Sequence, residues 1–263
     1  MPEELRSAAP QMDERTREVE LLCHAAQLVL ESGGETYRVE ETVRRMAKGL
    51  GMSDVNVVAF PTSIFVETQG RACVRRISHR GTNMRRLVLT NDVSRQTEHG
   101  ELTLAQAERA LDAVSRDPGI RQDLAIPACG LACGSFCLLV GGGLRAFLIA
   151  ILIGVILQAA QPLFSRMTTG ALLGNFCGGL LSAVLAQAAQ LALPGLEVNA
   201  VIIGGIMPYL SGLLMTTAVR DTMYGDLVSG VARAVEALLL AASVAAGVFV
   251  GLKLTAMMGG FWL

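Results

Sequence analysis

The sequence predicts an α-helical membrane protein, in which a bundle of five transmembrane helices follows a small cytoplasmic α+β domain. Residues 1–124 hold 17 of the 22 Lys and Arg residues and 19 of the 23 Asp and Glu residues, so residues 125–263 hold only nine charges. Five apolar segments in that second part approach or exceed the ~18–20 residues that a bilayer core requires. Mean hydropathy is +0.47 and 17% of residues are charged, against about 25% in a typical soluble domain. An entirely soluble protein, a secreted disulfide scaffold and a disordered chain are therefore excluded.

The predicted divisions are a disordered tail at 1–12, a cytoplasmic α+β domain at 13–124 and a transmembrane domain at 125–263. Apolar residues at helical spacing predict helices over 13–32 and 36–50. The period then changes to two, which predicts strands near 55–59, 64–68 and 73–77, with a hairpin turn at 69–71. Helical spacing returns over 82–99, and Thr103 and Gln106 form a capping-box pattern before another helix. The predicted order is two helices, a small sheet and two helices.

The five apolar segments lie near 125–142, 146–164, 171–193, 198–219 and 228–252. No signal peptide precedes them, which predicts a multi-pass inner-membrane protein. Basic residues favour a cytoplasmic N-terminal domain and an external C-terminus, with Trp262 near the outer interface; the inner side would carry Arg121, Arg166, Arg220 and Arg233, and the outer side Arg145 and Lys253.

Small residues at four-residue spacing predict close helix packing in the transmembrane part. They are Gly174, Gly178, Ser182 and Ala186 in the third segment, and Gly247 and Gly251 in the fifth. Cys129, Cys133 and Cys137 share the same spacing in the first segment and are expected to be packing residues rather than metal or redox groups.

Polar residues within or beside the apolar segments predict a substrate pathway, because such groups in hydrocarbon usually face a cavity or a partner. Pro208 interrupts the fourth segment, and a broken helix with polar neighbours is a common way to build a midplane site. Arg220 could hold a carboxylate by a two-pronged contact, and Asp221 or Asp226 could carry a coupling proton. The predicted substrate-binding residues are Arg220, Asp221, Thr216, Thr217, Pro208, Asn175 and Asn199; the predicted coupling or gating residues are Asp226, Arg233, Glu236, Gln158 and Gln161. The alternative makes Arg220 an inside anchor and Arg233–Glu236 a structural ion pair.

Two parts of the sequence resemble the threonine/serine exporter (ThrE) family. The first is the stretch Gly33-Gly34-Glu35-Thr36-Tyr37-Arg38-Val39-Glu40-Glu41-Thr42, with Pro61-Thr62 later; the second runs over 207–221 and 225–237 and includes Pro208, Arg220, Asp221, Asp226 and Arg233. The resemblance extends from about residue 18 to 252. Its soluble-domain motif consists of Glu35, Thr36, Tyr37, Arg38, Glu40, Pro61 and Thr62.

The resemblance implies a subunit of a secondary exporter that moves threonine and serine, or a dicarboxylate such as succinate, out of the cytoplasm. It also implies the large subunit of the split form of the family, which works with a second, small membrane protein. An odd number of segments without an inverted repeat independently predicts such a partner or a homo-oligomer. We expect no enzymatic activity, cofactor or metal, and the absence of a basic stripe excludes nucleic acid as a partner.

Two alternatives place the activity in the soluble domain. It could be a membrane-anchored enzyme, with an acidic cluster at Glu35, Thr36, Glu40 and Glu41, although Glu40 and Glu41 also lie at pairing distance from Arg44 and Arg45 on a solvated helix face. It could instead be a sensor or an assembly platform for the helical bundle.

Overall fold

The computed structural model describes residues 13–167 and 170–259, and its contacts divide the chain into two compact units. The first unit contains Met1–Gly119 together with Thr217–Arg233, and the second contains Ile120–Thr216 together with Ala234–Leu263. The first unit thus includes a segment that the sequence analysis assigned to the transmembrane domain. The predicted tail at 1–12 and the predicted position of Trp262 lie outside the described residues.

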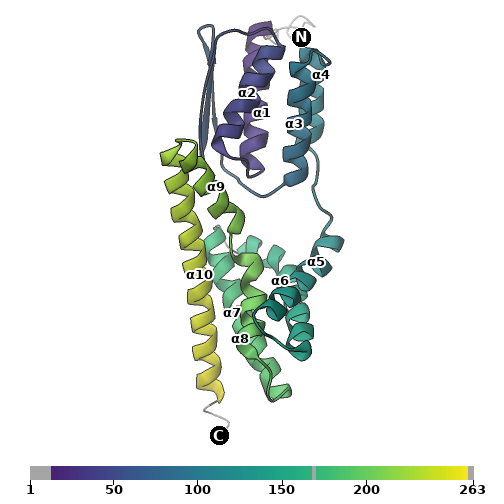
Figure 1. The fold of residues 1–263 in the computed structure, drawn as a ribbon, viewed down its shortest axis with the longest axis vertical. Helices are drawn as coiled ribbons and strands as arrows, with labels where there is room; N and C mark the ends of the chain where they lie inside the picture. Colours follow the sequence, from purple (N-terminus) through teal and green to yellow (C-terminus); the bar gives the residue numbers. More distant parts are fainter. Residues whose placement is uncertain (1–12, 168–169, 260–263) are drawn as a thin grey trace, which may run out of the picture. The chain divides into compact units, whose positions relative to one another are not determined.

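The first unit begins with the predicted order of helices and strands. These elements are α1 (Glu14–Glu31), α2 (Thr36–Gly49), β1 (Val55–Phe60), β2 (Ser63–Thr68), β3 (Arg71–Arg76), α3 (Met84–Glu98) and α4 (Leu104–Ser115). Helices α1 and α2 cover one face of the sheet, and α3 and α4 pack on the opposite side of that helix pair (Figure 1). The core of the unit lies between these layers.

The sheet is antiparallel, with the strand order β1-β2-β3. Alternate residues such as Val57, Ile64 and Val66 are buried toward the helices, which explains the two-residue period of the sequence. Gln69 and Gly70 both have positive φ, as a tight two-residue hairpin turn requires. The strands and the predicted hairpin turn are therefore confirmed.

Helix α3 begins with a side-chain cap, in which Asn83 Oδ1 accepts a hydrogen bond from the Arg86 N–H at 2.9 Å. We expect Asn83→Ala to lower the free energy of unfolding by about 1 kcal/mol, because the first turn loses this acceptor. Thermal unfolding of the purified chain followed by circular dichroism measures the change. Asn91→Ala within the same helix is the control, and it should be neutral or stabilising because alanine is the better helix former. Equal losses in both variants would contradict the assigned cap.

The second unit is helical. Its elements are α5 (Gln122–Leu139), α6 (Leu144–Met167), α7 (Ala171–Ala192), α8 (Val198–Ile206) and the short 3₁₀ helix η2 (Met207–Tyr209). Helix α9 (Gly212–Met223) begins in the second unit and ends in the first, and α10 (Leu227–Gly259) does the reverse. The chain is therefore continuous between the two units through both of these helices.

Three helical stretches, in α6, α7 and α10, are long and apolar enough to cross a membrane. The pair Val198–Tyr209 and Gly212–Met223 passes the same test together but is bent by 55°, so it is either a broken span or a re-entrant loop. Within the described residues, the apolar part of α5, Asp123–Leu139, falls in the shorter class. The protein is thus a membrane-spanning one, with three or four candidate spans among the residues at 13–167 and 170–259, and the predicted count of five is not confirmed.

Small residues bring the backbones of α7 and α10 together, as predicted for Gly247, but the glycine of α7 in this contact is Gly179, whereas a Cβ atom on the predicted Gly174 would meet nothing within 4 Å. A Cβ atom on Gly247 in α10 would lie 2.1 Å from the Phe176 carbonyl oxygen in α7. The reverse contact is similar, since a Cβ atom on Gly179 would lie 2.4 Å from the Val244 carbonyl oxygen. Only glycine allows the two helices this separation.

The cysteines of α5 also have a packing role. Cys133 and Cys137 are free and buried. A Cβ atom on Gly154 in α6 would lie 2.6 Å from the Cys133 sulfur, and one on Gly204 in α8 would lie 3.0 Å from the Cys137 Cβ. These thiols fill the space between α5 and its two neighbours, in agreement with the packing role predicted from their spacing.

Candidate functional site

A cavity of about 440 Å³ in the second unit lies at the break between α8 and α9. It brings together four residues that the sequence analysis proposed for substrate binding, coupling or gating: Gln158, Gln161, Asn175 and Pro208. The remaining lining residues are Phe164, Gly170, Ala171, Gly174, Tyr209, Ser211 and Leu240. The polar side chains in this lining are amides and hydroxyls, and none carries a formal charge.

Hydrogen bonds hold the amide groups of the lining in place. Asn175 Nδ2 donates to the Tyr209 carbonyl oxygen at 3.1 Å, and Gln158 Nε2 donates to Gln161 Oε1 at 2.9 Å. Helix η2 ends at Tyr209, where the last carbonyl groups of a helix lack intrahelical donors, and Asn175 supplies a donor to the Tyr209 carbonyl. The break is therefore stabilised by a polar side chain from α7.

Two helix N-termini contribute to the same cavity. Gly170, the N-cap residue of α7, and Ala171, its first residue, both line it. Ser211 lies directly before α9, and its carbonyl oxygen accepts from the Met215 N–H in the first turn. The first N–H groups of a helix lack intrahelical acceptors and carry partial positive charge. This uncharged cavity therefore has the electrostatic character to receive an anion.

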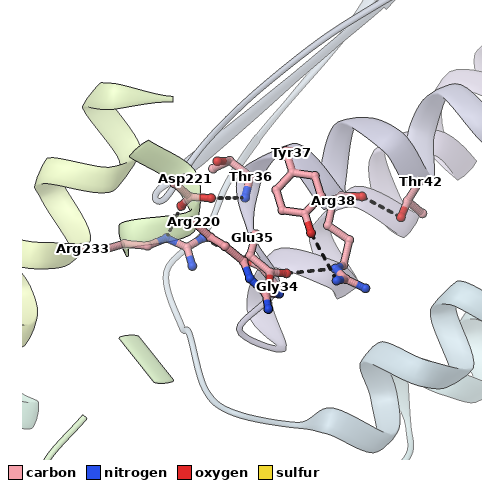
Figure 2. Close-up of polar contacts among 9 residues, drawn as sticks. All are labelled: Gly34, Glu35, Thr36, Tyr37, Arg38, Thr42, Arg220, Asp221 and Arg233. Carbon is pink, nitrogen blue, oxygen red and sulfur yellow. Dashed lines mark hydrogen bonds and ion pairs between the residues drawn. The ribbon is translucent and has the colours of Figure 1, made fainter. Parts of the chain in front are cut away.

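A second group of predicted residues meets within the first unit, where the turn between α9 and α10 contacts the start of α2 (Figure 2). Asp221 Oδ1 accepts from the Thr36 N–H at 3.0 Å, and Asp226 Oδ2 accepts from Thr36 Oγ1 at 2.9 Å. Thr36 is the first residue of α2, and its N-cap residue Glu35 makes no side-chain cap of its own. The helix is thus capped by residues about 185 positions later in the chain.

The same contact contains a buried ion pair. Arg233 Nε lies 3.1 Å from Asp221 Oδ2, and the two side chains are 4% and 0% exposed. Arg233 Nη2 also donates to the Gly34 carbonyl oxygen at 2.9 Å. Gly34 has no room for a side chain, because a Cβ atom there would lie 2.6 Å from Val29 Cγ1. The glycine pair of the first motif therefore lets the chain turn tightly between α1 and α2 and presents a carbonyl group to Arg233.

Glu35 lies between two arginines beside this ion pair. Its Oε1 accepts from Arg220 Nη1 at 2.7 Å, and its Oε2 accepts from Arg38 Nε at 2.9 Å (Figure 2). Burial raises the pKa of Glu35, but the hydrogen bond from its own backbone N–H and the two arginines outweigh burial and hold the pKa below its usual value. Ionised Glu35 therefore stabilises this contact at neutral pH, and its contribution is lost only as the pH falls through that lowered pKa.

Two tyrosines and the other residues of the soluble motif complete this region. Tyr37 and Tyr224 stack with ring centroids 4.1 Å apart, and Tyr37 Oη accepts from Arg38 Nη2 at 3.3 Å. Glu40 pairs with Arg44 at 2.7 Å on the solvated face of α2, as its spacing suggested. Pro61 and Thr62 form the turn between β1 and β2, where the Thr62 carbonyl oxygen accepts from the Ile77 N–H at 2.8 Å.

The remaining predicted residues do not line the cavity. Thr216 Oγ1 donates to the Leu213 carbonyl oxygen within α9 at 2.9 Å, and Asn199 is exposed at the start of α8. Thr217 is buried, and Glu236 is partly buried on α10. Sequence reasoning missed Tyr209, Ser211, Tyr224 and the N-terminus of α7 as site components. The position of Tyr209 and Ser211 beside Pro208 was the signal that could have identified them.

Comparisons with known proteins identify the family of the chain. The family model ThrE, described as "Putative threonine/serine exporter", matches residues 20–255. The "Probable threonine/serine exporter" of Mycobacterium tuberculosis is 28% identical over 92% of this chain and 47% of its own length, and the "Threonine/serine exporter" of Corynebacterium glutamicum is 26% identical over 89% and 50%. The "Probable succinate transporter subunit YjjP" of Klebsiella aerogenes is 25% identical over 92% of this chain and 96% of its own length.

The chain spans about half the length of the first two relatives. No solved structure matches it. The family and these relatives are named as transporters rather than enzymes, in agreement with the sequence prediction. Since the family model covers most of its residues, the chain belongs to the threonine/serine exporter family.

Proposed function

We propose that the chain is a subunit of a secondary exporter that moves a small carboxylate-bearing metabolite out of the cytoplasm, and that the cavity at the α8–α9 break binds this solute. The solute would be threonine, serine or a dicarboxylate such as succinate, which are the compounds in the relatives' names. The observation that carries the proposal is the cavity itself. Its volume of about 440 Å³ falls within the ~300–1,000 Å³ of small-molecule sites.

The chemistry of the lining supports an anionic or zwitterionic solute. Asn175, Gln158 and Gln161 offer amide groups, and the N-termini of α7 and α9 offer backbone N–H groups. Transporters commonly place the positive ends of interrupted helices against an anionic substrate group. A carboxylate could be held here without a buried basic side chain, which would be costly to place in hydrocarbon.

A parity argument from the first unit constrains the number of membrane crossings, taken together with the proposed N-inside orientation. Asp221 hydrogen-bonds to Thr36, so the end of α9 and the start of α2 lie on the same side of the membrane. The chain between residues 119 and 217 must then cross the bilayer an even number of times. Four crossings by α5, α6, α7 and the bent pair satisfy this condition, as do two by α6 and α7 if α5 does not cross and the bent pair is re-entrant. With α10, the first arrangement gives the predicted five crossings and an external C-terminus.

We further propose that the chain works with a second small membrane protein, or as a homo-oligomer. A relative that the chain covers almost completely is named a transporter subunit. Alternating access around a central site commonly requires two structural repeats or bundles that move against each other. A companion subunit or a second copy of this chain would supply the second bundle.

The test fills the cavity without disturbing its walls. A Cβ atom on Gly174 meets nothing within 4 Å, so Gly174→Leu should fold normally while its side chain occupies the cavity. We expect efflux of labelled succinate, threonine or serine to fall by roughly tenfold or more, because the solute loses its space. Efflux is measured in cells that express the chain with every companion subunit it requires.

Ala188→Leu is the matched control, since Ala188 is exposed on the same helix, α7, and does not line the cavity. Membrane abundance of each variant separates loss of transport from loss of protein. If Gly174→Leu is abundant and exports as fast as the Ala188→Leu control, the cavity is not the solute site. If the unsubstituted chain exports none of the three solutes, the proposed substrate class is wrong.

A further inference from the structure

Arg38 and Arg220 form a carboxylate clamp that is already occupied by a side chain of the chain itself. The two oxygens of Glu35 each accept a hydrogen bond from a different guanidinium group, one on α2 and one on α9, at 2.9 and 2.7 Å. Hydrogen bonds between ionised partners are among the strongest in proteins, and arginine is well suited to recognise carboxylates. This arrangement is therefore a ligand-binding geometry in which Glu35 takes the place of a ligand.

The arginines can be reached from solvent, whereas the carboxylate between them is enclosed. The Arg220 side chain is 55% exposed and that of Arg38 is 32% exposed, but Glu35 is only 9% exposed. Among the described residues, the hydrogen bonds of Arg220 engage only Glu35. An incoming anion can thus approach Arg220 through its remaining N–H donors before Glu35 moves.

Glu35 can leave the clamp without unfolding α2. It is the N-cap residue of this helix, yet its side chain makes no capping hydrogen bond. Asp221 and Asp226 cap the helix instead through Thr36. The backbone of Glu35 remains held, because its carbonyl oxygen accepts from the Val39 N–H at 3.1 Å. Only side-chain rotation is needed to vacate the arginines.

We propose that Arg38 and Arg220 form a second carboxylate subsite, distinct from the cavity, at which the carboxylate of the exported solute displaces that of Glu35. The identity of the ligand rests on the proposed function. Exchange of one carboxylate for another leaves the charge at the arginines unchanged, so no unpaired guanidinium is created. Glu35 acts as a tethered competitor, and it keeps the subsite closed until solute is abundant.

The proposal predicts that removal of the competitor strengthens binding. The affinity of a site that is mostly closed is reduced by the fraction of time it is open. In Glu35→Gln the side chain keeps its size but loses its charge, so we expect succinate to bind the purified full chain in detergent at least about tenfold more tightly. Isothermal titration calorimetry measures the affinity, and uncharged succinamide should not bind in any variant.

Two further variants decide whether the tighter binding occurs at these arginines. Glu35→Gln combined with Arg220→Gln should lose the gain, because one half of the clamp is missing. Glu41→Gln is the matched control on the same helix, since Glu41 pairs with Arg45 on the exposed side of α2, and it should bind succinate as the unsubstituted chain does. Arg220→Lys, with Glu35 intact, keeps the positive charge but loses the planar guanidinium group that can bind both oxygens of a carboxylate. It should therefore weaken succinate binding.

The outcomes separate this subsite from the cavity and from the proposed function. Unchanged affinity in Glu35→Gln, or a gain that survives the loss of Arg220, would overturn the subsite. The Glu35→Gln variant can be compared only if its unfolding temperature stays close to that of Glu41→Gln. If it unfolds at a much lower temperature, Arg220→Lys becomes the test, and succinate affinity in Arg220→Lys equal to that of the unsubstituted chain would overturn the subsite. Inorganic sulfate is a second probe: if it follows the predicted pattern when succinate does not, the clamp binds anions but the proposed solute is wrong. Because Gly174 lines the cavity and not the arginine clamp, adding Gly174→Leu to Glu35→Gln should leave the increase in succinate affinity intact.

Discussion

Replacement of Asp221 by alanine is expected to lower the free energy of unfolding by about 3–5 kcal/mol. Its partner Arg233 is 4% exposed, so the variant removes a carboxylate that lies 3.1 Å from a buried guanidinium group. The Thr36 N–H at the start of α2 also loses its acceptor. Chemical unfolding of the purified chain in detergent, followed by circular dichroism, measures the loss.

Two variants control this prediction. Asp92→Ala removes a carboxylate that pairs with Arg95 on the surface of α3, and it should cost less than about 1 kcal/mol because exposed pairs contribute little. Asp221→Asn combined with Arg233→Met removes both buried charges and keeps an acceptor for Thr36. This double variant should recover most of the loss. Equal costs for Asp221→Ala and Asp92→Ala would show that the pair is not buried as described.

Replacement of Gly247 by valine is expected to separate α7 from α10. A Cβ atom at this position would lie 2.1 Å from a carbonyl oxygen and 2.9 Å from the Leu180 backbone nitrogen. Neither atom belongs to a flexible side chain, so the helix backbones must move apart. Overpacking of a well-packed interior costs about 1–3 kcal/mol or more, and the neighbouring close contact at Gly179 would be lost as well. The yield of monodisperse chain after extraction and its thermal unfolding temperature measure the effect.

Gly174→Val is the matched control for this variant. Gly174 lies in α7, where a Cβ atom meets nothing within 4 Å, and it therefore tests the change from glycine to valine without a backbone clash. We expect the control to stay close to the unsubstituted chain in yield and unfolding temperature. If Gly247→Val behaves like the control, the predicted close approach of the two helices does not stabilise the unit.

Local features of the fold could be predicted from the sequence because each is encoded within a few neighbouring residues. The two-residue period marked the strands, Thr103 and Gln106 marked the start of α4, and Pro208 marked the break after α8. Segment length was less informative. The first apolar segment forms a helix whose apolar part, Asp123–Leu139, belongs to the shorter helices of 10–17 residues, so length and composition alone do not make it a span.

The candidate sites could be predicted only in part. Gln158, Gln161 and Asn175 were identified as polar groups in apolar segments and Pro208 as a helix break, and all four line one cavity. The partners of the charged residues were not accessible in the same way. Spacing suggested Glu236 as a partner for Arg233, and it gave no sign of two further partners: Arg233 lies beside Asp221 and donates to the Gly34 carbonyl oxygen, 199 positions away. No local rule links residues so distant, because their pairing depends on the path of the whole chain.

The capping of α2 by Asp221 has a consequence for biosynthesis. The N-terminal elements leave the ribosome first, but the acceptor that completes the first turn of α2 is made only after about 185 further residues. At about 5–20 residues per second, the nascent N-terminal region spends on the order of ten seconds or more without its final stabilising contact. Completion of this region is therefore coupled to successful membrane insertion, and a chain that fails to insert would expose an incomplete module to chaperones and proteases.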